Sequence, residues 1–518
     1  MTQTTSLAGR LAIVALALAL PSAAIAQQRQ NRAPAPPQQQ QKEESKKEDP
    51  KRETTSGILR LLPGDSTTEH TIELASGKSL AYTATAGTLA LYDQSGKQTA
   101  AVFYTAYVAK RPDNAPRPLT FGFNGGPGAA SAYLHLGLVG PKILQFGDGY
   151  DAATAQLRSN PHTWLEFTDL VMIDPVGAGW SRAAKPDGND AFRGVRRDAD
   201  FFAKVISLYV ARNSRSGSPK YLLGESYGGF RAAKVARALL QDQGVAVSGI
   251  VMVSPLLEGA FTFGGGRLAL GAALNFPSLV AAELERTRSM SKEALAEAER
   301  FAMTEYLTTL AGAPPQGEAA RAFYAKVAKM TGIPEEDVAK ARGFLRDYYV
   351  KDLSSADGMV MSRYDASFGM KDPFPDNRND RGPDPVLDGF TRAYSGAFVG
   401  YARDELGFRT DMTYVLLSGE GGNWNWREGR SEPSVSDDLR ILLTLNPSFR
   451  LVIAHGYSDL VTPYMPSRYV VEHLPPFEQP ERVQLKNYSG GHMFYAAEEP
   501  RISFSTDMKA FFIPGKGS

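Results

Sequence analysis

The sequence contains no cysteine among its 518 residues. Without a thiol there is no cysteine nucleophile, no zinc–thiolate or iron–sulfur site and no disulfide framework. A covalent mechanism in this chain must therefore use another nucleophile. The lack of thiols also suits an oxidising compartment, where stray cysteines mispair.

An excess of charge of either sign is lacking too. The formal net charge is +1, which gives no long-range field to attract nucleic acid or an anionic membrane, so we expect no nucleic-acid partner. Long apolar runs are equally scarce, and the run at 11–20 is too short to span a membrane comfortably. Hydrophobic residues still make up 43% of the chain, which is enough for a sizeable core.

The first residues have the pattern of a cleavable signal peptide. Arg10 precedes the apolar run, Pro21 ends it, and Ala24-Ile25-Ala26 has the small-x-small form of a signal-peptidase site. We expect residues 1–26 to be removed after Ala26 and the protein to be periplasmic or secreted, with a retained anchor as the alternative. Residues 27–55 are rich in Gln, Pro, Lys and Glu, so a disordered linker is expected there.

The rest of the chain alternates strand and helix patterns. Residues 57–110 carry short alternating segments separated by turns, which is typical of antiparallel strands. Short apolar runs bounded by turn residues follow, as in parallel strands buried on both faces, and helical stretches lie between them. These runs are 119–123, 170–173, 221–223, 249–253 and 450–454. The pattern predicts an α/β fold with a mostly parallel, doubly wound sheet and antiparallel N-terminal strands.

Strand patterns thin out between residues 258 and 432. Helical spacing runs from Ser291 to Leu307, and Thr331 to Asp337 resembles a helix start with Pro334 at the first position. We therefore expect an inserted, mainly helical cap at 259–434. It would divide the α/β domain into a first part, 56–258, and a second part, 435–518.

One motif carries chemistry. Gly224-Glu225-Ser226-Tyr227-Gly228 follows an apolar strand and precedes a helix candidate, which is the context of a nucleophile elbow. Such a turn exposes its serine at a helix N-terminus, where amide groups and the helix dipole favour a developing negative charge. We predict that Ser226 is the nucleophile.

A serine hydroxyl needs a base, and in the order Ser, Asp, His the base comes later in the chain. His492 lies in the glycine-rich stretch 489–493, which could aim its ring into a cleft, and it is the predicted base. His455 ends a strand beside a glycine and is its main rival, while His473 lies in a helix-like context that indicates a structural role.

The acid that orients the histidine is predicted to be Asp459, because it lies in a loop after the apolar strand 451–454. Glu420, in a glycine-rich loop, remains an alternative, and Asp437 and Asp438 are weaker ones because a helix is expected to begin there. The oxyanion hole needs two backbone N–H groups. Tyr227, after the nucleophile, and Gly126, in the early loop 123–128, are the predicted donors.

Together these segments resemble the serine carboxypeptidase family. The matching residues are Asn124-Gly-Gly-Pro-Gly128, Asp174 to Ser181, Gly224-Glu-Ser-Tyr-Gly-Gly229, Asp459 and Gly490-Gly-His-Met493. The resemblance implies an α/β-hydrolase fold with an inserted cap, and removal of C-terminal residues from peptides through an acyl-enzyme. It implies that Ser226, Asp459 and His492 form a triad, and that Asn124 and Glu225 hold the terminal carboxylate of the substrate.

Two positions depart from the family pattern. Gly122 stands where the family usually has Trp, and Leu138 stands where it has a second carboxylate-binding Glu. The expected function is a secreted serine carboxypeptidase that acts on peptides without a cofactor or metal. An esterase or acyltransferase of the same fold is one alternative, and a non-catalytic binding protein on this scaffold is another.

Overall fold

The computed structural model describes residues 57–111, 116–147, 150–263, 265–345, 358–377, 382–427, 432–476 and 479–513. The chain divides into two units, 1–53 and 54–518. All the described residues belong to the second unit. The expected signal peptide and linker lie outside the described residues, so both stay predictions.

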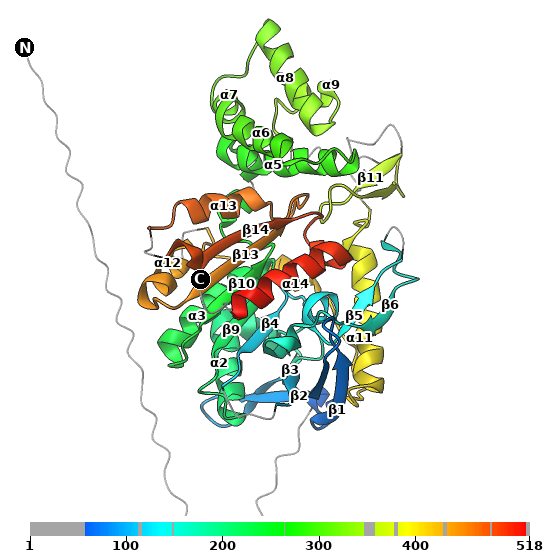
Figure 1. Ribbon diagram of the computed structural model, residues 1–518, viewed down its shortest axis with the longest axis vertical. Coiled ribbons are helices and arrows are strands. Elements are labelled where there is room, and N and C mark those ends of the chain that lie inside the picture. Colours follow the sequence, from blue (N-terminus) through cyan, green and yellow to red (C-terminus); the bar gives the residue numbers. More distant parts are fainter. Residues whose placement is uncertain are drawn as a thin grey trace, which may run out of the picture. The chain divides into compact units, whose positions relative to one another are not determined.

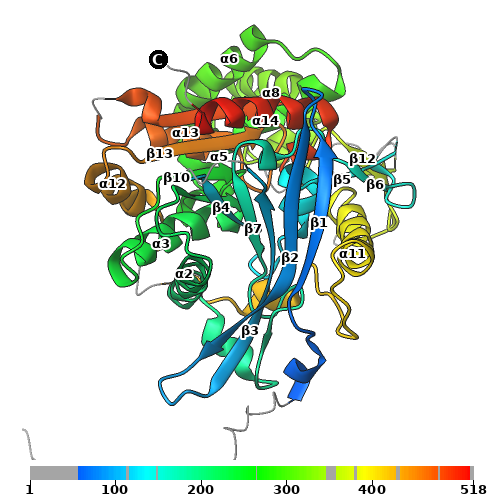
Figure 2. The same ribbon diagram turned by 60° about the horizontal axis from the view of Figure 1, so that its bottom comes forward.

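Within the described residues, ten strands form one sheet in the order β1-β2-β3-β7-β4-β9-β10-β13-β14, with β8 paired to β3. The strands from β1 to β7 in this order pair antiparallel, and the pairs from β7 to β14 are parallel. Figure 2 shows β1, β2 and β3 as long neighbouring strands. The strands are β1 Ser66–Glu73, β2 Ser79–Tyr92, β3 Gln98–Ala109, β4 Leu119–Phe123, β7 Asp169–Ile173, β8 Arg182–Ala183, β9 Lys220–Glu225, β10 Gly249–Val253, β13 Arg450–Gly456 and β14 Val483–Tyr488.

Both faces of the sheet are buried, as the apolar runs of the sequence predict. Along β10, Val251 and Val253 belong to one hydrophobic cluster, whereas Ile250 and Met252 belong to the other. This division follows from the period of two along a strand. Helices α2, α3 and α12 pack in the second cluster, and α14 packs in the first, where Figure 1 shows it crossing the sheet. These helices are α2 Val195–Arg212, α3 Tyr227–Asp242, α12 Ser436–Leu445 and α14 Glu498–Phe512, and α13 spans Tyr464–Glu472.

This architecture confirms the predicted fold class: an α/β fold with a mostly parallel sheet and antiparallel N-terminal strands. Parallel strands bring their carboxyl ends to one edge of the sheet, and loops at that edge form the sites of such folds. Here the loops after β4, β9 and β13 carry Asn124, Ser226 and Asp459 respectively.

The segment expected to be a cap has two parts that pack differently. Helices α5, α6, α8 and α9 share one hydrophobic cluster, and Figure 1 shows them gathered with α7 beyond the sheet. Helix α11 instead contributes Tyr394 and Phe398 to the cluster on one face of the sheet. The bounds are α4 Gly259–Thr262, α5 Ala269–Arg286, α6 Lys292–Phe301, α7 Leu307–Ala311, α8 Gly317–Thr331, α9 Glu335–Lys340, β11 Met359–Met361, β12 Gly369–Lys371 and α11 Leu387–Asp404. The limits 259–434 and the role of a cap stay predictions.

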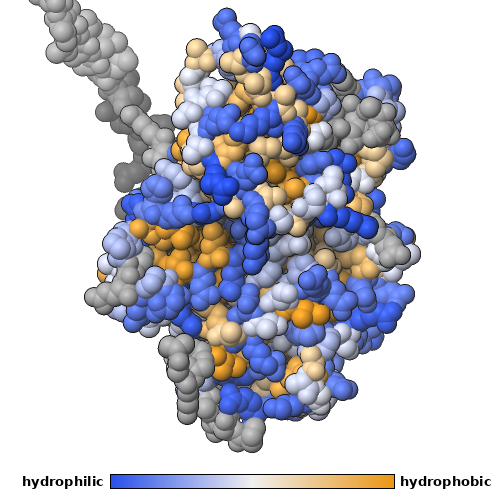
Figure 3. Space-filling view, turned by 45° about the horizontal axis from the view of Figure 1, so that its top comes forward, coloured by the Kyte–Doolittle hydropathy of each residue, from blue (hydrophilic) through white to orange (hydrophobic). Residues whose placement is uncertain are grey.

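Pro334 is the N-cap of α9, one residue before the position predicted for it. Its fixed φ suits either place, because neither needs its missing N–H group. Further short elements include α1 Ala132–Leu134, β5 Lys142–Gln145 and β6 Gln156–Ser159. Among the helices of the described residues, none combines the length and the apolar character needed to cross a bilayer. Apolar patches lie between hydrophilic residues on the face drawn in Figure 3.

Candidate active site

Ser226 lies in the sharp turn between β9 and α3. Its backbone has φ +60° and ψ −126°, a region that a residue with a Cβ rarely adopts. Such strain persists only where the surroundings enforce it. Here the Ser226 amide donates to the carbonyl of Val253, 2.9 Å away at the end of β10, and Gly229 N–H donates to the Ser226 carbonyl at 3.0 Å.

The flanking glycines of the motif are required by close backbone contacts. A Cβ on Gly224 would lie 2.0 Å from the Gly228 carbonyl oxygen. One on Gly228 would lie 2.7 Å from the carbonyl oxygen of Phe123. The glycine pattern therefore reflects a turn in which strand, helix and the neighbouring loop nearly touch.

His492 and Asp459 are in direct contact. Nδ1 of His492 lies 2.8 Å from Oδ2 of Asp459, and both side chains are buried. Asp459 also accepts hydrogen bonds from the amides of Val461 and Thr462 and, at 2.9 Å, from the Thr462 hydroxyl. The bond at Nδ1 fixes the orientation of the imidazole and leaves Nε2 free to exchange a proton.

The charges of this pair stabilise each other. Burial acts to raise the pKa of Asp459, but the nearby His492 and the hydrogen bonds to the carboxylate hold it below its usual range. Burial likewise acts to lower the pKa of His492, but the charge and hydrogen bond of Asp459, together with the charges of Glu225 and Asp384, outweigh burial, so the pKa of His492 is raised. An imidazolium formed during a reaction would be stabilised in this place.

The loop that carries His492 is held from two sides. Ser254, directly after β10, donates its hydroxyl to the His492 carbonyl at 2.8 Å. The His492 amide donates to the carbonyl of Tyr364 at 2.5 Å, and the two rings meet edge to face with centroids 5.2 Å apart. Because Val253 and Ser254 are consecutive, the end of β10 links the backbones of Ser226 and His492.

The loop after β4 lies against the start of α3. A Cβ on Gly125 would lie 2.5 Å from the backbone nitrogen of Tyr227. Gly126, the other predicted donor, is exposed and has φ +96°, which favours glycine. The two predicted oxyanion donors therefore belong to segments in contact.

A buried arginine supports this junction. Nε of Arg231 donates to Oδ2 of Asp198 at 2.7 Å, and its Nη1 donates to the backbone carbonyl of Asn124. The Tyr227 hydroxyl donates to the same Asp198 oxygen at 3.2 Å. The ion pair thus joins the loop after β4 to the first turn of α3. Sequence reasoning missed Arg231, whose partners lie far away along the chain.

Glu225, next to Ser226, is a buried carboxyl group with polar partners. Its Oε2 accepts hydrogen bonds from Nδ2 of Asn124 and, at 2.8 Å, from the hydroxyl of Tyr495. Burial raises the pKa of Glu225 to about 7, outweighing the charge of His492 and these hydrogen bonds, which lower it. The structure therefore joins Asn124 and Glu225, as the resemblance implies, and adds Tyr495, which the sequence did not single out.

The two departures from the family pattern are filled by packing. Leu138 is fully buried in the hydrophobic cluster. A Cβ on Gly122 would lie 2.7 Å from Sδ and Cε of Met172, so the methionine occupies the space beside it. Neither position presents a polar group.

The rival residues have other partners. Nε2 of His455 lies 2.8 Å from the Ser467 hydroxyl, and burial lowers the pKa of His455 to about 4. His473 is exposed and bonds the Tyr469 carbonyl at the end of α13. Asp438, in the first turn of α12, pairs with Lys234 at 3.0 Å. The side chain of Glu420 lies outside the described residues.

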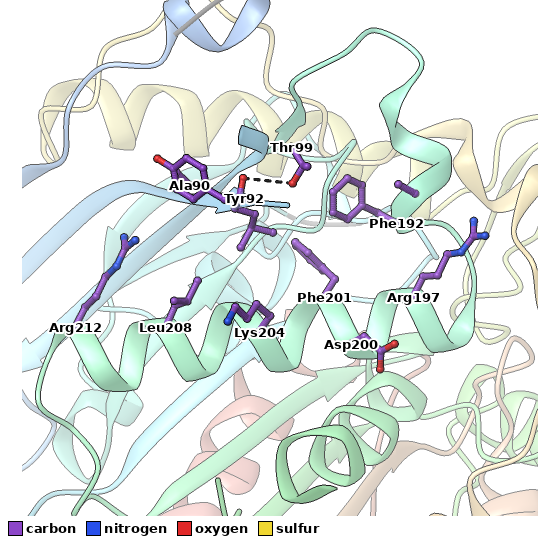
Figure 4. A pocket seen from close by; sticks show the side chains of 12 residues that line it. Ala90, Tyr92, Thr99, Phe192, Arg197, Asp200, Phe201, Lys204, Leu208 and Arg212 are labelled. Atoms are coloured by element: carbon purple, nitrogen blue, oxygen red, sulfur yellow. Dashed lines mark hydrogen bonds between the residues drawn. The ribbon is translucent and has the colours of Figure 1, made fainter. Parts of the chain in front are cut away.

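A separate surface groove of about 560 Å³ lies between α2 and strands β2 and β3. Figure 4 shows Leu208 and Arg212 rising from α2 toward these strands. The groove is lined by Ala90, Leu91, Tyr92, Thr99, Ala191, Phe192, Arg197, Asp200, Phe201, Lys204, Leu208 and Arg212. None of the candidate site residues lines it.

Comparisons with known proteins support the resemblance. Residues 80–260 match the sequence model described as serine carboxypeptidase. The chain is 30% identical over 169 residues to serine carboxypeptidase-like 42 of Arabidopsis thaliana, which covers 30% of this chain and 33% of that protein. It is 34% identical over 119 residues to the pheromone-processing carboxypeptidase KEX1 of Metarhizium robertsii, covering 23% of this chain and 18% of that protein.

Among solved structures, the chain is similar to a prohormone-processing carboxypeptidase from Saccharomyces cerevisiae. The TM-score is 0.52 at 14% identity, covering 83% of this chain and 90% of that chain, so this likeness concerns the fold. The sequence matches reach only a third or less of the curated relatives' length. The predicted resemblance to serine carboxypeptidases is confirmed, and the matched segment includes Asn124, Gly126 and the elbow at Ser226.

Proposed function

From this similarity we propose that the chain is a secreted serine-type carboxypeptidase that removes C-terminal residues from peptides through an acyl-enzyme on Ser226. The observation that carries the proposal is the buried carboxyl group of Glu225 directly before Ser226, bonded to Asn124. A carboxyl group there has no use in cleaving a neutral ester. The same carboxyl group can bind a substrate that carries a carboxylate.

The reaction begins with proton transfer. Nε2 of His492 takes the hydroxyl proton of Ser226 while Oγ forms a bond to the carbonyl carbon of the last peptide bond. The N–H groups of Gly126 and Tyr227 hold the resulting oxyanion. The C–N bond then breaks, and the leaving amino group of the C-terminal residue takes the proton from His492.

The acyl-enzyme is hydrolysed by the same groups. Water attacks the ester carbon while His492 accepts a proton from it, and a second oxyanion forms at the same donors. When the C–O bond to Ser226 breaks, His492 returns the proton to Oγ. Asp459 stays ionised throughout and stabilises the imidazolium.

Glu225 is proposed to bind the C-terminal carboxylate of the substrate next to Ser226. Two ionised carboxylates repel, so the pair must share a proton. Burial raises the pKa of Glu225 to about 7, which keeps its carboxyl group protonated in acidic solution. A protonated Glu225 donates a hydrogen bond to the substrate carboxylate, and Asn124 lies beside it.

An esterase or acyltransferase is the second candidate, and Leu138 favours it. The buried, apolar Leu138 stands where the family pattern has a second acid for the terminal carboxylate. The third candidate, a non-catalytic binding protein, requires that Ser226 be unreactive. A fluorophosphonate probe distinguishes it, because only a reactive Ser226 is labelled in wild type and left unlabelled in Ser226→Ala.

Secretion belongs to the proposal as well. Expression of the full chain in a bacterium with a general secretion pathway, followed by N-terminal sequencing of the mature protein, should give a sequence that begins at Gln27. A protein that keeps residues 1–26 would contradict cleavage.

The proposed activity is tested by digesting a peptide library at several pH values and reading the products by mass spectrometry. We expect ladders shortened from the C-terminus at acidic pH with wild type and none with Ser226→Ala. Internal cleavage, or ladders that persist with Ser226→Ala, would overturn the proposal.

A further inference from the structure

The carboxyl group of Glu225 is held asymmetrically. Both of its hydrogen-bond donors, the Tyr495 hydroxyl at 2.8 Å and Nδ2 of Asn124, point at the same oxygen, Oε2. Oε1 has no hydrogen-bond partner among the described residues. An oxygen that already accepts two donors is a poor place for the acidic proton, because an O–H there would itself need an acceptor.

Tyr495 reaches Glu225 because the opposite helical segment leaves room for it. A Cβ on Gly137 would lie 2.6 Å from Cε2 of Tyr495 and 2.7 Å from the hydroxyl oxygen of Tyr394. All three tyrosines around this point, Tyr133, Tyr394 and Tyr495, are buried. Any side chain at residue 137 would displace the ring that supplies the hydrogen bond.

We propose that Tyr495 is a positioning residue of the carboxylate subsite, which together with Asn124 holds Oε2 of Glu225 so that the proton resides on Oε1 and faces the substrate. The inference rests on the proposed function, since it names how that site offers its proton to a C-terminal carboxylate. The proton is shared between Oε1 and the substrate oxygen, and no covalent bond to carbon is made or broken.

Among the described residues, Glu225 is the acid that bonds both Asn124 and Tyr495. His492 and Asp459 are the charged groups that act on it, the first lowering its pKa and the second raising it. The neighbouring tyrosines stay neutral, because burial raises the pKa of each and the charge of Glu225 raises it further. These tyrosines are Tyr133, Tyr364, Tyr394 and Tyr495. The positive charge of Arg501, on α14, acts to lower the pKa of Tyr394, but burial outweighs it.

The test compares wild type with Tyr495→Phe on a blocked dipeptide with a free C-terminal carboxylate and on its C-terminal amide, across pH. Loss of the hydrogen bond should raise KM for the free acid about three- to ten-fold, the effect of one buried hydrogen bond. Because that bond lowers the pKa of Glu225, its removal should also move the alkaline fall of activity to higher pH.

A matched control is Tyr401→Phe, which also removes a buried tyrosine hydroxyl, in this case from a residue of α11. Its partner is the Tyr107 hydroxyl at 3.1 Å, with no contact to Glu225. We expect wild-type KM and wild-type pH dependence from it. Gly137→Ala keeps every polar group yet crowds Tyr495, so it should reproduce the higher KM for the free acid.

A double variant separates positioning from general disruption. On a Glu225→Gln background, Tyr495→Phe should add less than a two-fold further loss, since both changes act through one carboxyl group. Equal losses on both backgrounds, or an unmoved alkaline limb, would overturn the inference. If wild type itself cleaves the amide as fast as the free acid, the proposed function fails instead, which is a different result.

Discussion

Nδ1 of His492 and Oδ2 of Asp459 are 2.8 Å apart, although the two residues are 33 positions apart in the chain. Helix α13 and strand β14 lie between them in the sequence and bring the chain back to the same edge of the sheet. Each residue stabilises the charged form of the other, since the pKa of His492 is raised and that of Asp459 is lowered. The contact makes the pair the acid–base centre of the proposed mechanism.

The first prediction concerns Asp459→Asn. The amide removes the charge that orients and stabilises the imidazolium, so we expect kcat to fall roughly 10³- to 10⁴-fold. The acidic limb of the pH–rate profile should also move to lower pH, because Asp459 raises the pKa of His492. Steady-state kinetics across pH measures both effects.

Asp438→Asn is the control for that change. Asp438, in the first turn of α12, pairs with Lys234 and Arg237 on α3, so the activity of Asp438→Asn should stay within about two-fold of wild type, as for most substitutions away from an active site. A loss as large as that of Asp459→Asn would contradict the assignment of the acid.

The second prediction concerns Glu225 and pH. Protonated Glu225 donates a hydrogen bond to the substrate carboxylate, so kcat/KM for a peptide with a free C-terminus should fall as pH rises through about 7, the raised pKa of Glu225. Glu225→Gln cannot ionise, and its profile should lack this alkaline limb. A wild-type profile that stays flat up to pH 9 would refute the shared proton.

The same shift makes a prediction about stability. The fold favours protonated Glu225, whose pKa is raised from 4.5 to about 7. Its stabilising contribution is therefore complete below pH 4.5 and is lost as pH rises through 7, by roughly 3 kcal/mol in total. Urea unfolding at pH 4.5 and 8 measures the free energy of unfolding, which should change less with pH in Glu225→Gln than in wild type. An equal change in both proteins would argue against a raised pKa of Glu225.

The elbow itself predicts a stability effect for Gly224→Ala. The new Cβ would meet the Gly228 carbonyl oxygen at 2.0 Å, so the turn must shift. We expect a loss of several kcal/mol in the free energy of unfolding, at the upper end for single substitutions, together with loss of activity. Gly217→Ala, with no atom within 4 Å of the new Cβ, should unfold like wild type; if both variants behave alike, the elbow is looser than described.

The next prediction concerns Tyr364, which contacts the predicted base. Its ring meets the His492 ring at 90° with centroids 5.2 Å apart. An aromatic contact of this kind is worth about 0.5 to 1.5 kcal/mol, so Tyr364→Leu should lower kcat roughly two- to ten-fold, whereas Tyr364→Phe should not. The measurement is kcat of the two variants with the same peptide. Equal kcat values for Tyr364→Leu and Tyr364→Phe would contradict a role of the aromatic ring.

The sequence predicted the parts whose rules are local. The strand predicted at 119–123 coincides with β4, because a short apolar run between turn residues is typical of a strand buried on both faces. The glycines at 224 and 228 are needed by backbone contacts within the elbow and its neighbouring loop, so the motif alone indicates the turn.

What the sequence did not predict depends on contacts between distant segments. Tyr495 bonds Glu225 across 270 residues, and Arg231 bonds Asn124 across 107. Tyr364 contacts His492 through a backbone carbonyl and a ring, for which residue type gives no signal. Such partners become visible only once the fold brings the segments together.

The most direct test of the account is the ratio of kcat/KM for a blocked dipeptide with a free C-terminal carboxylate to that for its C-terminal amide, measured near pH 5. With Glu225 protonated, we predict a ratio of at least about ten, since a hydrogen bond to a charged group is worth about 1.5 to 3 kcal/mol, and no turnover of either substrate by Ser226→Ala. A ratio near one in wild type, or turnover that survives in Ser226→Ala, would contradict a serine carboxypeptidase centred on Ser226 and Glu225.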